Sequence, residues 1–144
     1  MPDQRFAIAS DHAGVSLKAV LRAELEATGR EVVDLGPNGD GPVDYPDYAQ
    51  ALAQAIESGR ADRGVLICGS GIGMSIAVNR SRAVRGALCH DADEARLARA
   101  HNDANVLALG ARRVSEETAR RCLQAFLDTR FEGGRHQARV AKLS

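Results

Sequence analysis

Short apolar runs alternate along the chain with segments whose apolar residues recur at helical spacing. The runs predict buried strands at residues 6–9, 32–35, 64–68, 85–89 and 105–109. The spacing predicts five helices, which cover residues 17–29, 46–59, 71–81, 91–101 and a stretch that opens at 115. Strands that alternate with helices in this way predict an α/β fold, a three-layer Rossmann-like α/β/α sandwich with a five-stranded parallel sheet.

Length and composition fit one domain over residues 1–144, closed by a basic tail at about 131–144. Of the 144 residues, 44% are hydrophobic and 26% charged, which excludes a disordered chain. We see no signal peptide and no apolar run of membrane length. The three cysteines are an odd number without close pairing, which argues against a disulfide framework or a zinc site. We therefore expect a cytoplasmic protein.

The balance of charges limits the partners that the chain can attract. Nineteen basic and nineteen acidic residues give a formal net charge of zero. Such a chain has no overall attraction to nucleic acid or to a membrane, so we expect neither as a partner. Any anion site must be a local cluster of donors.

Ligands of parallel α/β sheets bind at the carboxyl ends of the strands, so chemistry is expected where the predicted strands end. Three of these ends carry polar or special residues: Ser10 to Gly14, Cys68 to Gly73, and Gly110 to Arg113. The apolar strands themselves read as scaffold.

The strongest local signal is the segment from Cys68 to Met74, with glycines at 69, 71 and 73. Alternate glycines let backbone N–H groups point inward together, and the following helix adds its positive end, which favours an anion cradle. No Gly-Lys-Ser/Thr follows, so the segment is not a Walker loop. Met74 stands where a dinucleotide fingerprint needs its third glycine. The simpler alternative is a tight turn between strand and helix.

Cys68 stands at the mouth of this cradle, where a helix N-terminus stabilises a thiolate. The alternative is that it is a small buried hydrophobe, as most lone cysteines are. Cys89 and Cys122 fit that alternative, because one lies in a predicted strand and the other on an apolar helix stripe.

Two histidines have polar neighbours near the ends of predicted elements. His12 follows Asp11 directly after the first strand, and His101 precedes Asn102 shortly before the fifth. A lone histidine is more often a surface or core residue than a catalyst, and His90 is left with that interpretation. The first two are candidates for acid–base work or anion contact.

The tail carries Arg135 and Arg139, which share one face if the segment is helical. Two convergent guanidinium groups suit a phosphate, which accepts paired hydrogen bonds. The alternative is a solvated basic helix.

Taken together, these segments resemble the type B ribose-5-phosphate isomerase family, which also includes galactose-6-phosphate and allose-6-phosphate isomerases. The resemblance spans nearly the whole chain, in the family's order. The matching segments are Ser10 to Gly14, Asp44 to Pro46, Cys68 to Gly73, His101 to Leu107 and Glu132 to Arg139.

The resemblance implies an aldose–ketose isomerase that interconverts D-ribose 5-phosphate and D-ribulose 5-phosphate through an enediolate. It implies that Cys68 is the base between C1 and C2 and that His101 opens the sugar ring. The enediolate oxygens would be held by Ser70 and by the backbone of Gly69, Ser70, Gly71, Ile72 and Gly73. The remaining substrate contacts that it implies are Asp11 for the sugar hydroxyls, Asn102 and Tyr45 as lining, and His12, Arg112, Arg135 and Arg139 for the phosphate.

The resemblance implies no cofactor and no catalytic metal, and it implies active sites shared across a homodimer or a dimer of dimers. A second type within the family has a glutamate base after the glycine loop; Met74 stands there here, so this chain has the cysteine type. His101 lies before the fifth strand and Cys68 at the end of the third. A strand of this length spans roughly 17 Å, so one subunit alone cannot bring both side chains to one sugar.

Two alternatives stay open at this point. One is an isomerase of another phosphorylated sugar, such as allose 6-phosphate, galactose 6-phosphate or a tetrose phosphate. The other is a non-catalytic phosphate-ligand sensor, which would need the cradle but neither Cys68 nor His101.

Overall fold

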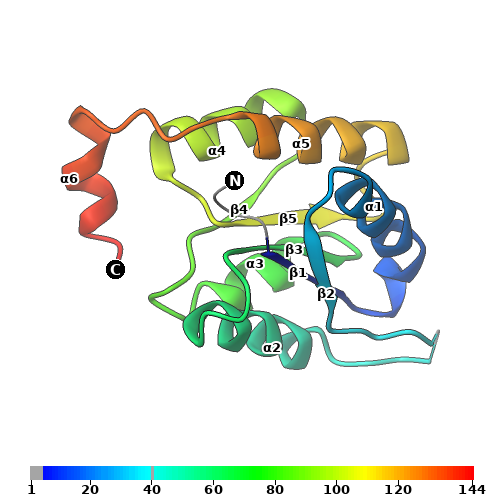
Figure 1. The fold of residues 1–144 in the computed structure, drawn as a ribbon. Helices are drawn as coiled ribbons and strands as arrows, with labels where there is room; N and C mark the ends of the chain where they lie inside the picture. Colours follow the sequence, from blue (N-terminus) through cyan, green and yellow to red (C-terminus); the bar gives the residue numbers. More distant parts are fainter. Residues whose placement is uncertain (1–4, 40) are drawn as a thin grey trace.

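The computed structural model describes residues 5–39 and 41–144, and it forms an α/β fold (Figure 1). Residues 1–4, on which part of the expectation of no signal peptide rests, lie outside the described residues. The elements follow one another along the chain in this order: β1 (Arg5–Ser10), η1 (His12–Gly14), α1 (Val15–Ala27), β2 (Glu31–Asp34), α2 (Tyr45–Glu57), β3 (Arg63–Cys68), α3 (Ile72–Val78), β4 (Gly86–Leu88), α4 (Ala92–Asn102), β5 (Val106–Gly110), α5 (Glu116–Asp128) and α6 (Arg135–Ala141).

The predicted elements are present, with differences at their ends. β4 is one residue shorter than expected at each end, and at its start the Arg85 N–H donates to the Asn105 side chain at 2.7 Å rather than to a neighbouring strand. Asp91 and Ser115 cap α4 and α5 through their side chains. Asp44 is the N-cap of α2, but its side chain makes no capping hydrogen bond.

All five strands are parallel, and their order across the sheet is β2-β1-β3-β5-β4. The chain reverses direction across the sheet between β1 and β3, which makes a topological switch point. β4 lies at the far edge, and β5 returns to pair with β3, where Gly110 stands opposite Cys68. The sequence had not predicted the order of these last two strands.

Helices cover both faces of the sheet, so the predicted three-layer sandwich is confirmed. On one face α1, α4 and α5 pack on strand residues such as Phe6, Ile8 and Leu107. On the other face α2 and α3 pack on Ala7, Leu66 and their neighbours. Strand side chains alternate between the two faces, and Cys68 belongs to the face covered by α2 and α3.

The basic tail forms a sixth helix, α6, which projects beyond the sandwich beside the end of α4 (Figure 1). Only His136 and Val140 of this helix are buried. No helix in residues 5–39 or 41–144 has the length and the apolar character that crossing a membrane requires.

Candidate active site

The turn from β3 into α3 holds the Cys68 thiol against the backbone. The Gly71 N–H donates to the Cys68 sulfur at 3.2 Å, and the Cys68 residue is only 4% exposed. Gly71 has a φ of 79°, and a Cβ at this position would lie 2.9 Å from the Leu109 carbonyl carbon. The turn therefore needs glycine here, and the N–H that it presents stabilises a thiolate.

The rest of the cradle is ordered by short local contacts. The Ser70 hydroxyl accepts a hydrogen bond from the Ile72 N–H at 3.2 Å. A Cβ at Gly73 would lie 2.5 Å from the Tyr45 ring, so this ring rests directly on the first turn of α3. The N–H groups of that turn have no partner within the helix, which suits oxygen atoms that carry negative charge.

The end of β5 closes the cradle from the side. The Ala111 N–H donates to the Cys68 carbonyl at 2.8 Å, and the Arg112 N–H donates to the Gly69 carbonyl at 2.9 Å. A Cβ at Gly69 would lie 3.0 Å from Arg112 Nη1, so the guanidinium group lies close over that glycine. The pairing of β5 with β3 thus brings a cation to the glycine that follows Cys68.

Asp11 and His12 come to the same edge from β1. The Asp11 N–H donates to the Ile67 carbonyl at 3.0 Å, and the Asp11 carboxylate caps η1 by accepting from the Ala13 N–H at 2.9 Å. His12 Nδ1 accepts from the Val43 N–H at 3.2 Å. In the neutral ring the proton then sits on Nε2, which is left free to donate to an anion.

Most of these residues line an open hollow of about 630 Å³ at the carboxyl edge of the sheet, and His12 follows the lining residue Asp11 in the chain. We call Asp11, His12, Tyr45, Cys68, Ser70 and Arg112 the carboxyl-edge group. Two lining residues were missed by the sequence analysis, Arg113 and Ile76. Ile76 follows Ile72 by four residues, so the two share one face of α3, and this spacing was the signal for Ile76 in the sequence. In the structure both residues are largely exposed, Ile76 at 60% and Ile72 at 51%.

The other predicted residues lie elsewhere. His101, Asn102 and Arg139 line a second hollow of about 340 Å³, between the end of α4 and α6. Arg135 is the first residue of α6, one turn before Arg139. We call His101, Asn102, Arg135 and Arg139 the α6 group.

The structure keeps the two groups apart within one chain. The strands begin on the side of α6 and end on the opposite side of the sandwich (Figure 1). His101 lies in the last turn of α4, before β5 begins, whereas Cys68 ends β3. One chain thus carries two incomplete sets of the residues that the sequence analysis had assigned to one sugar phosphate.

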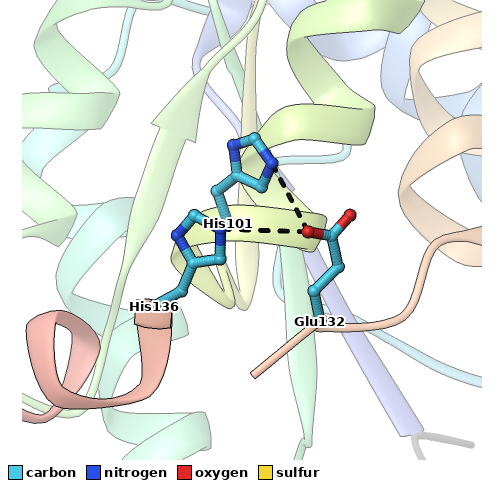
Figure 2. A group of neighbouring side chains, drawn as sticks. All are labelled: His101, Glu132 and His136. Carbon is cyan, nitrogen blue, oxygen red and sulfur yellow. Dashed lines mark ion pairs between the residues drawn. The ribbon is translucent and has the colours of Figure 1, made fainter. Parts of the chain in front are cut away.

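His136 and Glu132 belong to the surroundings of His101 and were not predicted as site residues. The His101 and His136 rings stack, with centroids 4.3 Å apart, and both face Glu132 (Figure 2). Burial lowers the pKa of His136, with further lowering by His101 and Arg135. The spacing of four between Glu132 and His136 was the feature of the sequence that could have predicted their proximity.

Cys89 and Cys122 are buried, as predicted for structural cysteines. Burial raises the pKa of Cys89 to about 12 and that of Cys122 to about 11. Neither thiol is therefore a base at neutral pH, which leaves Cys68 as the candidate nucleophile or base.

Comparison with known proteins gives matches over almost the full chain. Residues 6–143 match the family described as Ribose/Galactose Isomerase. Ribose-5-phosphate isomerase B of Escherichia coli is 43% identical over 141 residues, which cover 98% of this chain and 95% of that protein. D-erythrulose-4-phosphate isomerase of Pectobacterium atrosepticum is 43% identical over 140 residues, or 96% and 91% of the two chains.

A solved structure also matches. It is ribose-5-phosphate isomerase B from Mycoplasma genitalium with bound ribulose-5-phosphate, at a TM-score of 0.91 and 42% identity. The match covers 96% of this chain and 93% of that chain.

Proposed function

The chain belongs to the ribose/galactose isomerase family and is a sugar phosphate isomerase, and from this we propose that it interconverts D-ribose 5-phosphate and D-ribulose 5-phosphate. The observation that carries the proposal is the Cys68 sulfur, which accepts the Gly71 N–H at the mouth of the glycine cradle. This arrangement supplies a base beside donors for a developing oxyanion.

In the proposed reaction the Cys68 thiolate takes the proton from C2 of the open-chain aldose. The electrons of that C–H bond form the C1–C2 double bond, and the carbonyl oxygen at C1 takes up the negative charge. The N–H groups from Gly69 to Gly73 and the Ser70 hydroxyl stabilise this enediolate. Return of the proton to C1, with transfer of the C2 hydroxyl proton to the oxygen at C1, gives the ketose.

Ring opening is assigned to His101, and this step needs a second chain. His101 and Cys68 lie at opposite edges of the sheet in one subunit. We propose that a homodimer, or a dimer of dimers, joins the carboxyl-edge group of one subunit to the α6 group of its neighbour. A two-fold interface makes two such sites at once, because the same contact occurs twice.

The phosphate is assigned to His12 and Arg112 of one subunit and to Arg135 and Arg139 of the neighbour. The Val43 N–H on Nδ1 leaves the His12 Nε2 proton free for a phosphate oxygen. Asp11 would contact the sugar hydroxyls, and Tyr45 and Asn102 would line the sugar. No step of this reaction requires a metal or a cofactor.

The test is turnover of D-ribose 5-phosphate by the purified protein in the presence of EDTA. We expect the ketose to form, and we expect solvent protons to exchange into C1 of D-ribulose 5-phosphate. Absence of both from a folded protein would contradict the proposal.

A second candidate substrate is a tetrose phosphate, because the Pectobacterium relative acts on D-erythrulose 4-phosphate by its name and is as similar as the E. coli relative. Allose 6-phosphate and galactose 6-phosphate use the same chemistry. Comparing kcat/KM for these phosphorylated sugars would decide among them. The largest value for ribose 5-phosphate is the expected result.

A further inference from the structure

Three metal-ligating side chains meet between the end of α4 and the start of α6 (Figure 2). His101 Nε2 lies 3.6 Å and His136 Nε2 lies 3.8 Å from the same Glu132 oxygen. All three ligand atoms lie within 4.8 Å of one another. These N–O distances are longer than a hydrogen bond, so the three groups converge without satisfying one another.

The backbone fixes the three residues beside one another. The Glu132 N–H donates to the Ala100 carbonyl at 2.9 Å, which ties the loop to the last turn of α4 next to His101. Gly133 and Gly134 have φ values of 68° and 54°, and the turn that they make leads into α6. The His136 N–H donates to the Gly133 carbonyl at 3.0 Å, and the His136 ring stacks on His101 beside Glu132.

The donor set suits zinc. Two imidazole nitrogens and one carboxylate oxygen are a common zinc set, with bonds of roughly 2.0–2.2 Å and a fourth position left open. A tetrahedral ion with such bonds has ligand atoms roughly 3.3 Å apart. The two N–O distances therefore need to shorten by only a few tenths of an ångström.

We propose that His101, Glu132 and His136 bind a zinc ion, or a divalent transition metal of similar preference, and that the bound ion inhibits the enzyme. The ion would occupy the His101 nitrogen that ring opening needs. The binding site stands on the geometry alone, and only the inhibition rests on the proposed function. The site is regulatory in this proposal, and the isomerisation itself still needs no metal.

Two features limit the affinity. The lone pair of an imidazole lies in the ring plane, and the planes of the stacked rings differ by only 13°. The rings must rotate out of this stack to aim at one ion. Arg139 lines the same hollow and repels a cation. We therefore expect reversible binding in the micromolar range, weaker than in structural zinc sites.

Calorimetric titration of the full-length protein with zinc chloride, without substrate, tests the site. We expect one ion per chain. Glu132→Gln and His136→Asn should each weaken binding by about tenfold or more, since even outer-shell changes cost that much at zinc sites. The matched control is Glu94→Gln, which alters the exposed His90–Glu94 pair at 3.1 Å and should leave zinc binding unchanged.

A Cys68→Ala variant separates this site from a thiol site. All three thiols are buried, but Cys68 lines the hollow at the carboxyl edge, so it is the thiol that could compete for zinc. Zinc binding should persist in Cys68→Ala. Loss of binding there, no binding by the wild-type chain, or equal binding by wild-type and Glu132→Gln would each overturn the proposed site.

Inhibition is then measured on the wild-type enzyme and on Glu132→Gln, with the sugar phosphate that is turned over. Zinc should inhibit the wild type, EDTA should reverse this, and the half-inhibiting concentration should rise about tenfold in the variant. Equal inhibition of both would overturn the regulatory role. If no sugar phosphate is turned over, the proposed function fails, while calorimetry still decides whether the zinc site exists.

Discussion

The carboxyl-edge group and the α6 group are held by the fold in different ways. Backbone hydrogen bonds across β1, β3 and β5 fix the first group, as between Asp11 and Ile67 or Ala111 and Cys68. The second group is divided between the last turn of α4, with His101 and Asn102, and the seven-residue helix α6, which buries only His136 and Val140. The thiol and its cradle are thus built into the sheet edge, whereas the arginines stand on a projecting helix beside His101.

This difference explains why one chain has all the predicted residues but no complete site. A parallel sheet gathers strand ends at one edge, so residues after β1, β3 and β5 meet without any further device. Residues before β5 and after α5 lie at the other edge, and under the proposed function the neighbouring subunit uses them. The predictions below test this division.

The largest effect is expected for the base. Cys68→Ala replaces the thiol by a methyl group, which cannot carry a proton, so kcat should fall by about 10² to 10⁴. The control Cys89→Ala removes a buried thiol outside the site and should leave kcat within about twofold. Steady-state assays on both folded variants measure kcat, and substantial turnover by Cys68→Ala would contradict the assignment of Cys68 as the base.

Mixing inactive variants tests the division between the two groups most directly. Cys68→Ala and His101→Asn homodimers should each be nearly inactive, because every site lacks either the Cys68 thiol or the His101 imidazole. After subunit exchange, about half of the dimers are mixed if assembly is random, and each carries one intact site. Activity should therefore recover to at most about a quarter of the wild-type value.

The control for this experiment is a mixture kept under conditions that prevent exchange, which should stay inactive. If activity does not return although exchange is demonstrated, Cys68 and His101 act from the same chain.

The His101→Asn variant also separates ring opening from proton transfer. Ribulose 5-phosphate cannot form the furanose ring of ribose 5-phosphate, so its enediolate step does not need the ring-opening imidazole. Exchange of solvent protons at C1, followed by NMR, should survive in His101→Asn. Exchange that is lost as fully as in Cys68→Ala would show that the two roles are not separate.

A smaller effect is expected for the arginines of α6. Arg135→Ala or Arg139→Ala should weaken binding of the phosphorylated sugar by about 1.5–3 kcal/mol, as for hydrogen bonds to charged groups. Thermal stability without ligand should barely change, because both side chains are exposed. Arg121→Ala, on the surface of α5, is the control. A large fall in the melting temperature with unchanged KM would favour a structural role instead.

The smallest effect concerns the end of β2, where Lys18 pairs with Asp34 at 2.6 Å. Burial by itself raises the pKa of Asp34, but hydrogen bonds from Lys18 and the Gly36 N–H, with the charges of Lys18 and Arg22, lower it further than burial raises it. A lowered folded-state pKa adds stability that is present above the unfolded pKa, about 3.9, and is lost as pH falls through the folded value.

Unfolding in denaturant at pH 7 and near pH 3 checks this expectation. Asp34→Asn should be less stable than wild type at pH 7, and the difference should shrink at the lower pH. The exposed Asp93–Arg96 pair supplies the control Asp93→Asn, whose effect should stay below about 1 kcal/mol. A difference that does not change with pH would mean that the Asp34 charge does not matter.

The sequence by itself determined the five strands, the first five α-helices and the glycine turn after β3, because these depend on local patterns. Apolar period and turn residues specify where strands and helices alternate, and the glycines at 69, 71 and 73 mark a turn that side chains would obstruct. The resemblance then added the roles of Cys68 and His101, which spacing alone had left open.

Only the tertiary structure decided the order of β4 and β5 and the neighbours of each site residue. Placing β5 beside β3 sets Gly110 opposite Cys68 and brings Arg112 over Gly69. The same fold sets Glu132 and His136 beside His101, far from Cys68. The physical reason is that these contacts join segments distant in sequence. They depend on how helices of similar apolar character pack on the two faces of one sheet, and no local pattern encodes that packing.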